Sequence, residues 1–251
     1  MKIEKYHGLG NTFLIVEYIQ NIDYVSLSKK LCDEKLSIGS DGLIVVKQNP
    51  LEMMIFNKDG SEALMCGNGL RCFVHFCHVH KLINKKDNIE IKTKTGFYYA
   101  DIISINPFVT KIKFNRSLVR KENLTILGCN YDSYFVKVGV PHNVIIKNQL
   151  SQELIDKLKF QDIKLNTNVD IIEQVNKNNI KVLTYEKGVG FTSSCGTGAV
   201  ASSLVSNYLL GGSNYISVLS EFGKMDVEID VNNVFLTGES NRICMIEVNN
   251  D

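Results

Sequence analysis

The chain has 251 residues, of which 44% are hydrophobic, and its 28 basic and 27 acidic residues give a net charge of +1. This length allows one large domain or two smaller ones, each with a core of its own. The balanced charge, without any block of like charges, argues against a nucleic-acid partner. The apolar runs are far shorter than the roughly 20 residues of a membrane-spanning helix, and the N-terminus lacks a signal-peptide pattern. We therefore expect a cytoplasmic protein that contacts neither nucleic acid nor membrane.

Short strand patterns dominate from the start of the chain. Apolar runs between turn residues predict strands, which in chain order cover 2–8, 12–18, 41–48, 52–60, 88–96, 97–103, 111–115, 134–147, 169–175, 179–188, 215–221, 224–231, 233–239 and 244–248. Helical patterns are few and cover about 26–36, 68–82, about 151–160 and 197–210. Many short strands with few helices predict an α+β fold.

The seven cysteines are an odd number in a chain too large to depend on disulfides, which favours reduced thiols. The only pattern that resembles a metal site is "CFVHFCHVH", where Cys72, His75 and His78 could share a helix face. The apolar residues between them favour a buried helix instead. We expect no metal site.

Two cysteine motifs stand half a chain apart. A strand and a polar loop lead into Cys-Gly-x-Gly and an apolar helix at Cys66 and again at Cys195, an interval of 195 − 66 = 129 residues. This spacing predicts an internal duplication with one motif in each of two lobes. We expect the first lobe to cover 1–113, completed by the last strand at about 241–251, and the second to cover 114–240.

The position of these cysteines suggests acid–base chemistry. The N-terminus of a helix presents unpaired N–H groups and positive potential, which favours a thiolate and can hold a carboxylate. If the lobes face each other across a cleft, one sulfur can remove the proton alpha to a bound carboxylate while the other protonates the opposite face. This chemistry is a racemisation or epimerisation that needs no cofactor. Alternatively, both cysteines only fill helix starts as small apolar residues.

The motifs "KYHGLGNTFLIVE", "SIGSDGLIVV", "IFNKDGSEALMCGNGLRC", "VGVPHNV", "NTNVDII" and "TYEKGVGFTSSCGTGA" together resemble the diaminopimelate epimerase family over the whole chain. This family belongs to the racemases that work without pyridoxal phosphate. The resemblance implies two pseudo-symmetric lobes, each a strongly curved, mostly antiparallel sheet around a central helix. It also implies interconversion of LL- and meso-diaminopimelate for lysine biosynthesis, no cofactor, and a possible homodimer.

The resemblance also implies roles for residues that match the family motifs. The catalytic residues would be Cys66, Cys195, His142 and Glu186. The substrate-binding residues would be Asn11, Asn57, Gly67, Asn68, Asn168, Lys187, Gly196 and Thr197. Asn57 and Asn168 would lie near the distal end of the substrate.

Some positions depart from the family pattern. The usual Glu-Arg-Gly reads Glu186-Lys187-Gly188, and the usual Gly-Glu-Thr reads Gly190-Phe191-Thr192. At position 187, lysine replaces the family arginine. The planar guanidinium of arginine can donate two parallel hydrogen bonds to a carboxylate, whereas the lysine ammonium is a point charge, so recognition of the distal carboxylate could differ. A racemase of another amino acid is therefore the main alternative, and a non-catalytic protein that binds an amino acid or zinc is a third.

Overall fold

The computed structural model describes residues 1–146, 152–160, 165–187, 189–192 and 194–248. The chain divides into two compact units. Unit 1 contains Met1–Lys113 and Gly238–Asp251, and unit 2 contains Phe114–Thr237. Strands β7 (Phe108–Asn115) and β16 (Asn233–Glu239) run through the two boundaries between the units.

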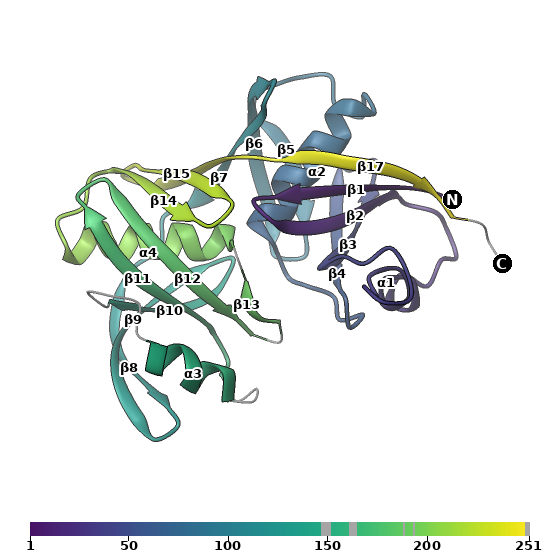
Figure 1. The fold of residues 1–251 in the computed structure, drawn as a ribbon. Coiled ribbons are helices and arrows are strands. Elements are labelled where there is room, and N and C mark those ends of the chain that lie inside the picture. Colours follow the sequence, from purple (N-terminus) through teal and green to yellow (C-terminus); the bar gives the residue numbers. More distant parts are fainter. Residues whose placement is uncertain (147–151, 161–164, 188, 193, 249–251) are drawn as a thin grey trace. The chain divides into compact units, whose positions relative to one another are not determined.

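Unit 1 is a mostly antiparallel sheet that joins both ends of the chain. Its other elements are β1 (Lys2–Gly8), β2 (Asn11–Glu17), α1 (Tyr24–Leu31), β3 (Gly42–Lys47), β4 (Glu52–Asn57), α2 (Gly67–Val79), β5 (Ile89–Thr93), β6 (Gly96–Ile105) and β17 (Asn241–Glu247). Antiparallel pairs are β17–β1, β1–β2, β3–β4, β5–β6 and β6–β7. Parallel pairs are β2–β3 and β4–β5. In Figure 1 the yellow β17 lies beside the purple β1, so the C-terminal strand completes this sheet.

Helix α2 is the centre of unit 1. It contacts β1, β2, β3, β4 and β17, and every residue in its first two turns is buried. A helix that is apolar on all sides needs such a surrounding sheet. Helix α1 is amphipathic instead. Asp23 caps its N-terminus by accepting from the N–H groups of Val25 and Ser26, and Tyr24 and Leu31 pack into a cluster on the sheet.

Unit 2 contains the remaining strands. Its other elements are β8 (Arg120–Ile126), β9 (Cys129–Val138), β10 (Val140–Ile146), α3 (Gln152–Phe160), β11 (Asn168–Asn176), β12 (Asn179–Glu186), β13 (Gly190–Thr192), α4 (Gly196–Leu209), β14 (Tyr215–Ser220) and β15 (Gly223–Ile229). Antiparallel pairs are β8–β9, β9–β10, β11–β12, β12–β13, β14–β15 and β15–β16. Parallel pairs are β10–β11 and β12–β14.

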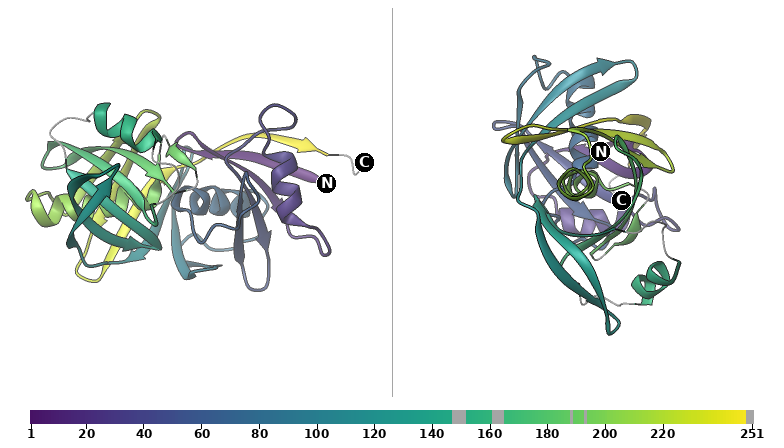
Figure 2. Two further views of the ribbon diagram at one scale, coloured as in Figure 1. Left: turned by 90° about the horizontal axis from the view of Figure 1, so that it is seen from below. Right: turned by 90° about the vertical axis from the view of Figure 1, so that its left-hand side faces the viewer.

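Helix α4 takes the central place in unit 2. Its residues from Gly196 to Ser206 are all buried, and it contacts β9, β10, β11, β12, β14 and β15. The right-hand view of Figure 2 looks along this helix, with the strands of unit 2 around it. Leu154 and Leu158 of α3 pack with Ile145 and Ile171 in a smaller cluster on the sheet.

The two units repeat one order of elements. In unit 1 the series is β1, β2, α1, β3, β4, α2, β5, β6, β7, and in unit 2 it is β9, β10, α3, β11, β12, α4, β14, β15, β16. Parallel and antiparallel pairs occur at the same steps of both series, and β17 and β8 occupy corresponding places beside β1 and β9. The prediction of an α+β fold with a curved sheet around a central helix is confirmed.

Several boundaries differ from the prediction. The helix expected at about 26–36 begins at Tyr24 and ends at Leu31, because Cys32 is its C-cap and turns follow. The strand expected at 134–147 divides at Gly139, whose φ of 68° suits a turn. Strands β8 and β13 were not expected. The predicted positions 147, 151, 188 and 249–251 lie outside the described residues.

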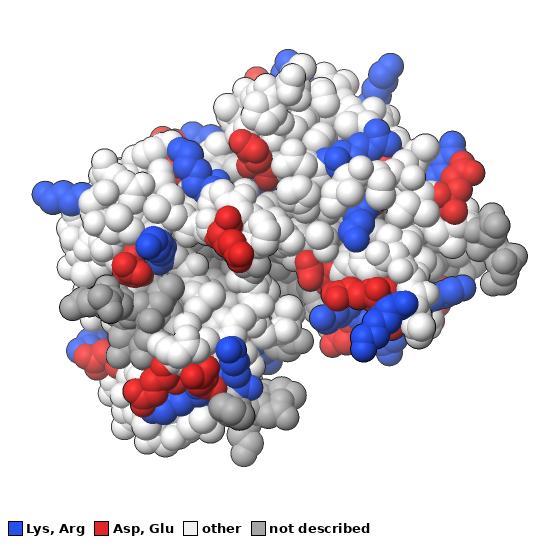
Figure 3. Space-filling model, in the orientation of Figure 1, with Lys and Arg blue, Asp and Glu red and all other residues white. Residues whose placement is uncertain are grey.

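The surface carries both signs of charge. On the face shown in Figure 3, acidic and basic side chains are interspersed. Within the described residues, no helix has both the length and the apolar character that a membrane span requires.

Candidate active site

Cys66 occupies the N-cap of α2. Its extended backbone (φ −144°, ψ 120°) lets the sulfur accept a hydrogen bond from the N–H of Gly69 at 3.4 Å. Its thiol also lies 3.8 Å from Oδ1 of Asn11, a residue at the start of β2. The sulfur therefore faces the first turn of the buried helix, as the sequence predicts.

An amide network supports this thiol in unit 1. Asn68 donates to Oδ1 of Asn11 at 3.3 Å, and Oδ1 of Asn68 accepts from Nη2 of Arg71 at 2.9 Å. Arg71 is fully buried and also donates to the carbonyls of Gly67 and Glu239. The structure thus brings together four predicted site residues of unit 1, namely Asn11, Cys66, Gly67 and Asn68.

Asn57 occupies a different setting, at the end of β4. Its side chain donates to Oγ of Ser61 at 2.9 Å, and its N–H bonds the Ser61 carbonyl. These contacts hold the loop between β4 and Cys66. Its predicted contact with the distal end of a substrate stays a prediction.

Cys195 repeats the geometry of Cys66 at the N-cap of α4. Its backbone is again extended (φ −123°, ψ 114°), and its sulfur accepts from the N–H of Gly198 at 3.3 Å. Oγ1 of Thr197 lies 3.4 Å from the same sulfur. Gly196 is the first residue of the helix, so its backbone lies at the positive end of the helix dipole.

A buried histidine adjoins this second thiol. His142 is fully buried on β10; its Nε2 lies 3.0 Å from Oγ1 of Thr197 and its Nδ1 2.7 Å from Oδ2 of Asp170. Oδ1 of Asp170 accepts from Thr184 at 2.7 Å. A continuous polar chain therefore runs from β11 through His142 to Cys195.

Glu186 is the second titratable neighbour of Cys195. Thr192 donates to its Oε1 at 2.7 Å, and the neighbouring Cys195 thiol lowers the pKa of Glu186. Burial raises the pKa of Glu186, and the hydrogen bond from Thr192 and the charge of His142 oppose that rise.

The thiol of Cys195 differs from our expectation. The helix terminus should favour its thiolate, yet burial raises its pKa well above the ordinary value, and the carboxylates of Glu186 and Asp170 raise it further. The hydrogen bonds that Cys195 makes with the Thr197 hydroxyl and the Gly198 N–H lower the pKa but do not outweigh these effects. For Cys195 the expectation of a lowered pKa is wrong, and the free protein holds this residue as a thiol at neutral pH.

We expect slow alkylation of Cys195 that accelerates when Glu186 is neutralised. Glu186→Gln removes a negative charge that raises the pKa of Cys195, so the thiolate fraction at pH 8 increases. Mass spectrometry of iodoacetamide-treated protein should show a several-fold faster reaction at Cys195. The exposed Cys244 is the internal control and should keep its rate. Equal rates at Cys195 in both proteins would contradict this assignment.

Asn168 and Lys187 meet at one edge of unit 2. The backbone N–H of Lys187 donates to Oδ1 of Asn168 at 2.9 Å, while its exposed ammonium group lies 3.5 Å from Oδ1 of Asn166. Phe191 packs edge-on against Tyr185, with ring centroids 5.2 Å apart, beside the cluster under α3. Phe191 therefore has a packing role, and Lys187 is the departure from the family pattern whose charged end is exposed.

Two polar residues of this site were missing from the sequence prediction. Asp170 lies among apolar residues in "NVDII", and Thr184 lies on the neighbouring strand β12. A charged residue inside an otherwise buried strand was the available signal for Asp170. Its partners could not be read from the sequence, because they depend on strand register and on the position of α4.

The pattern around Cys72 has a structural role. Cys72 is fully buried, and the ring of His75 stacks on Phe108 at 3.9 Å while its Nδ1 lies 3.2 Å from Oγ of Ser240. Among the residues that the structure describes, no group of three or more His, Cys, Asp or Glu side chains could hold a metal ion.

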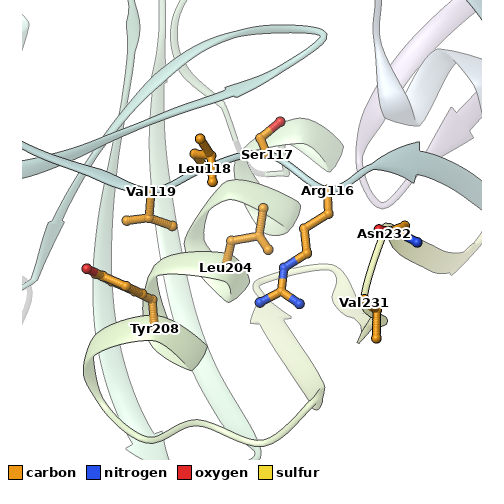
Figure 4. A pocket seen from close by; sticks show the side chains of 8 residues that line it. All are labelled: Arg116, Ser117, Leu118, Val119, Leu204, Tyr208, Val231 and Asn232. Atoms are coloured by element: carbon orange, nitrogen blue, oxygen red, sulfur yellow. The ribbon is translucent and has the colours of Figure 1, made fainter.

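A pocket of about 530 Å³ lies elsewhere in unit 2. Figure 4 shows its lining, which consists of Arg116, Ser117, Leu118, Val119, Leu204, Tyr208, Val231 and Asn232. These residues include no thiol, carboxylate or imidazole. The pocket therefore lacks the groups that acid–base chemistry at a carbon atom needs.

Comparison with known proteins places the chain in a family. The family model for diaminopimelate epimerase matches residues 3–110 and 134–243. A diaminopimelate epimerase of Caldanaerobacter subterraneus subsp. tengcongensis is 33% identical over 273 residues, covering 99% of either chain. One of Alkaliphilus metalliredigens is 32% identical and covers 97% of this chain and 96% of its own.

Solved structures share the fold at low identity. A putative phenazine biosynthesis PhzC/PhzF protein from Clostridium difficile has a TM-score of 0.74 at 15% identity and covers 99% of both chains. A hydroxyproline epimerase from Agrobacterium vitis, with bound trans-4-OH-L-proline, has a TM-score of 0.71 at 12% identity, covering 98% of this chain and 91% of its own. Together with the relatives, this fold defines an isomerase of the epimerase and racemase class. The chain belongs to the diaminopimelate epimerase family.

Proposed function

We propose that this protein interconverts LL- and meso-diaminopimelate by proton transfer between two cysteines, without a cofactor. The observation that carries the proposal is the repeated cysteine N-cap, with the same backbone conformation and the same sulfur–N–H hydrogen bond at Cys66 and Cys195. A purely apolar role for these cysteines does not explain why polar side chains, Asn11 at one and Thr197 at the other, adjoin both sulfurs.

The reaction would use the two sulfurs in opposite roles. One takes the α-proton as a thiolate and the other gives a proton to the opposite face of the carbon, with the roles exchanged in the reverse direction. N–H groups at the starts of α2 and α4, around Gly67, Asn68, Gly196 and Thr197, would stabilise the negative charge on the α-carboxylate. The raised pKa of Cys195 supports a role as proton donor in the free protein, so we propose that Cys66 takes the α-proton in the direction that begins from this state.

The remaining predicted residues would orient the substrate. His142 and Glu186 would lie beside the reacting amino group, and the charge of Glu186 already acts on Cys195. Asn57, Asn168 and Lys187 would recognise the distal amino acid group. We also propose that units 1 and 2 are the two lobes of the family and that the enzyme works in the cytoplasm as a homodimer.

The second candidate is a cofactor-independent racemase of another amino acid. It is favoured by Lys187, whose exposed ammonium group replaces the planar guanidinium expected of the family and lies 3.5 Å from Asn166. Phe191 gives it less support, because its ring packs against Tyr185.

Proton exchange in D₂O tests both candidates. Reduced protein is incubated with chelator, without pyridoxal phosphate, and with LL-diaminopimelate or single L-amino acids, and deuterium at the α-carbon is followed by NMR. We expect deuterium and meso product with diaminopimelate alone. Exchange confined to another amino acid would support the second candidate instead. Absence of exchange with every compound, from folded and reduced protein, would refute both. Protein alkylated at its cysteines is the control and should be inactive.

A further inference from the structure

Asp170 is a buried carboxylate in the interior of a strand. It is fully buried on β11 between the equally buried Val169 and Ile171. Each carboxylate oxygen has one partner, Thr184 at 2.7 Å for Oδ1 and Nδ1 of His142 at 2.7 Å for Oδ2. In the described part of the chain, His142 is the only basic group within ion-pair distance of Asp170. A buried charge is costly without partners of this kind.

The surroundings of Asp170 are shaped to hold its carboxylate. A Cβ atom at position 198 would overlap Oδ1 of Asp170 and Oγ1 of Thr184. Gly198 is also the residue whose N–H bonds the sulfur of Cys195. The first turn of α4 therefore has room for the carboxylate, and the thiol and Asp170 share one small region of unit 2.

We propose that Asp170 is a positioning residue for the reaction: it holds His142 in the Nδ1-protonated tautomer and thereby orients the chain from His142 through Thr197 to Cys195. This inference rests on the proposed function for its catalytic consequence. With Nδ1–H donating to Asp170, Nε2 accepts from the hydroxyl of Thr197 at 3.0 Å, and that hydroxyl accepts from the thiol of Cys195 at 3.4 Å. All three hydrogen bonds then run in one direction.

The same chain can move a proton when Cys195 must act as the base. The S–H bond of Cys195 breaks while Thr197 gains that proton, and the original hydroxyl proton of Thr197 passes to Nε2 of His142. The result is a thiolate and an imidazolium, and the carboxylate of Asp170 balances the imidazolium charge. An aspartate that sets the tautomer of a catalytic histidine has the same task in Ser-His-Asp triads.

The contacts of Cys66 in unit 1 differ from this chain. The residue two positions after Cys66 is Asn68, which bonds Asn11, and the amide of Asn11 also donates to the carboxylate of Asp41 at 3.1 Å. Thr197, two positions after Cys195, instead bonds His142. The imidazole of the chain thus adjoins Cys195, the cysteine that begins as a thiol.

Asp170→Asn tests this inference because it removes the charge and keeps the size. Nitrogen-15 NMR of labelled histidine, with His142→Gln to assign the signal, should show an Nδ1-protonated ring in the wild type and a shift toward the Nε2-protonated form in Asp170→Asn. We expect kcat to fall about 10- to 100-fold, with KM changed less than about twofold, since Asp170 does not touch the substrate. Asp226→Asn, a matched change at an aspartate that bonds Ser217, should change neither quantity.

A second variant tests the same inference if Asp170→Asn does not fold. Thr184→Val retains the charge of Asp170 but removes the hydrogen bond that Thr184 donates to its carboxylate. We therefore expect kcat to fall several-fold at constant KM. Thr184→Ser keeps the hydroxyl and should have the wild-type kcat. Unchanged kcat or an unchanged tautomer in Asp170→Asn would overturn the inference. If the wild type shows no epimerase activity, the proposed function fails, while the tautomer measurement still decides whether Asp170 orients His142.

Discussion

Replacing either N-cap cysteine with alanine should reduce epimerisation by about 10²- to 10⁴-fold, the range that general acid–base groups contribute. The two variants should also differ in a second property. Cys195→Ala retains Cys66, which the mechanism assigns as the first base, so it should still exchange the α-proton of one isomer with solvent deuterium while losing inversion. Chiral chromatography combined with mass spectrometry separates exchange from inversion.

Cys244→Ala is the matched control for these variants. Cys244 lies on β17 and is exposed, so its removal should leave the rate unchanged. Inversion above about a tenth of the wild-type rate in Cys66→Ala or Cys195→Ala would contradict the two-cysteine mechanism. Loss of folded protein is excluded by comparing the circular dichroism spectra of all three variants.

Arg71→Met should lower the free energy of unfolding by about 3 kcal/mol, the typical scale when one partner of a buried, charged hydrogen-bond network is removed. Arg71 is fully buried, and its guanidinium bonds the side chain of Asn68 and the carbonyls of Gly67 and Glu239. Methionine has similar length but donates no hydrogen bond, so these acceptors lose their partner. Urea unfolding followed by circular dichroism measures the change.

Arg120→Met is the control for Arg71→Met. Arg120 lies on β8 with its side chain 64% exposed, and its ion pair with Glu122 is 3.6 Å long. Exposed pairs of this kind contribute about 0–1 kcal/mol. Similar decreases in the free energy of unfolding of the two variants would show that the buried network around Arg71 stabilises the protein no more than an exposed ion pair does.

The sequence predicted the central helices well, because their signal is local. The motif Cys-Gly-x-Gly and the apolar run after it define both α2 and α4, which begin at Gly67 and Gly196. Strand β8 carried no such signal. Its first four residues, 120–123, are polar and exposed, so hydrophobic periodicity could not reveal it.

The sequence predicts those residues of the candidate site that lie at helix N-termini. It does not predict the contacts that depend on which strands pair and in which register. Cys66 and Cys195 follow from the two motifs, and Asn68 and Thr197 from the family resemblance. The pairing of His142 with Asp170 requires β10 beside β11, and the raised pKa of Cys195 requires its burial beside Glu186. A helix terminus favours the thiolate in isolation, but desolvation and two carboxylates outweigh it here.

The position of β17 has a consequence for synthesis on the ribosome. Unit 2 is continuous in the chain, whereas β1 of unit 1 pairs with β17, more than 230 residues later, and the N-terminal amine of Met1 bonds the carbonyl of Val248. The partner of β1 is therefore translated only after all of unit 2. Until then one edge of β1 is open to other chains, a known aggregation hazard. All residues of unit 2 are thus present in the nascent chain before the sheet of unit 1 can close.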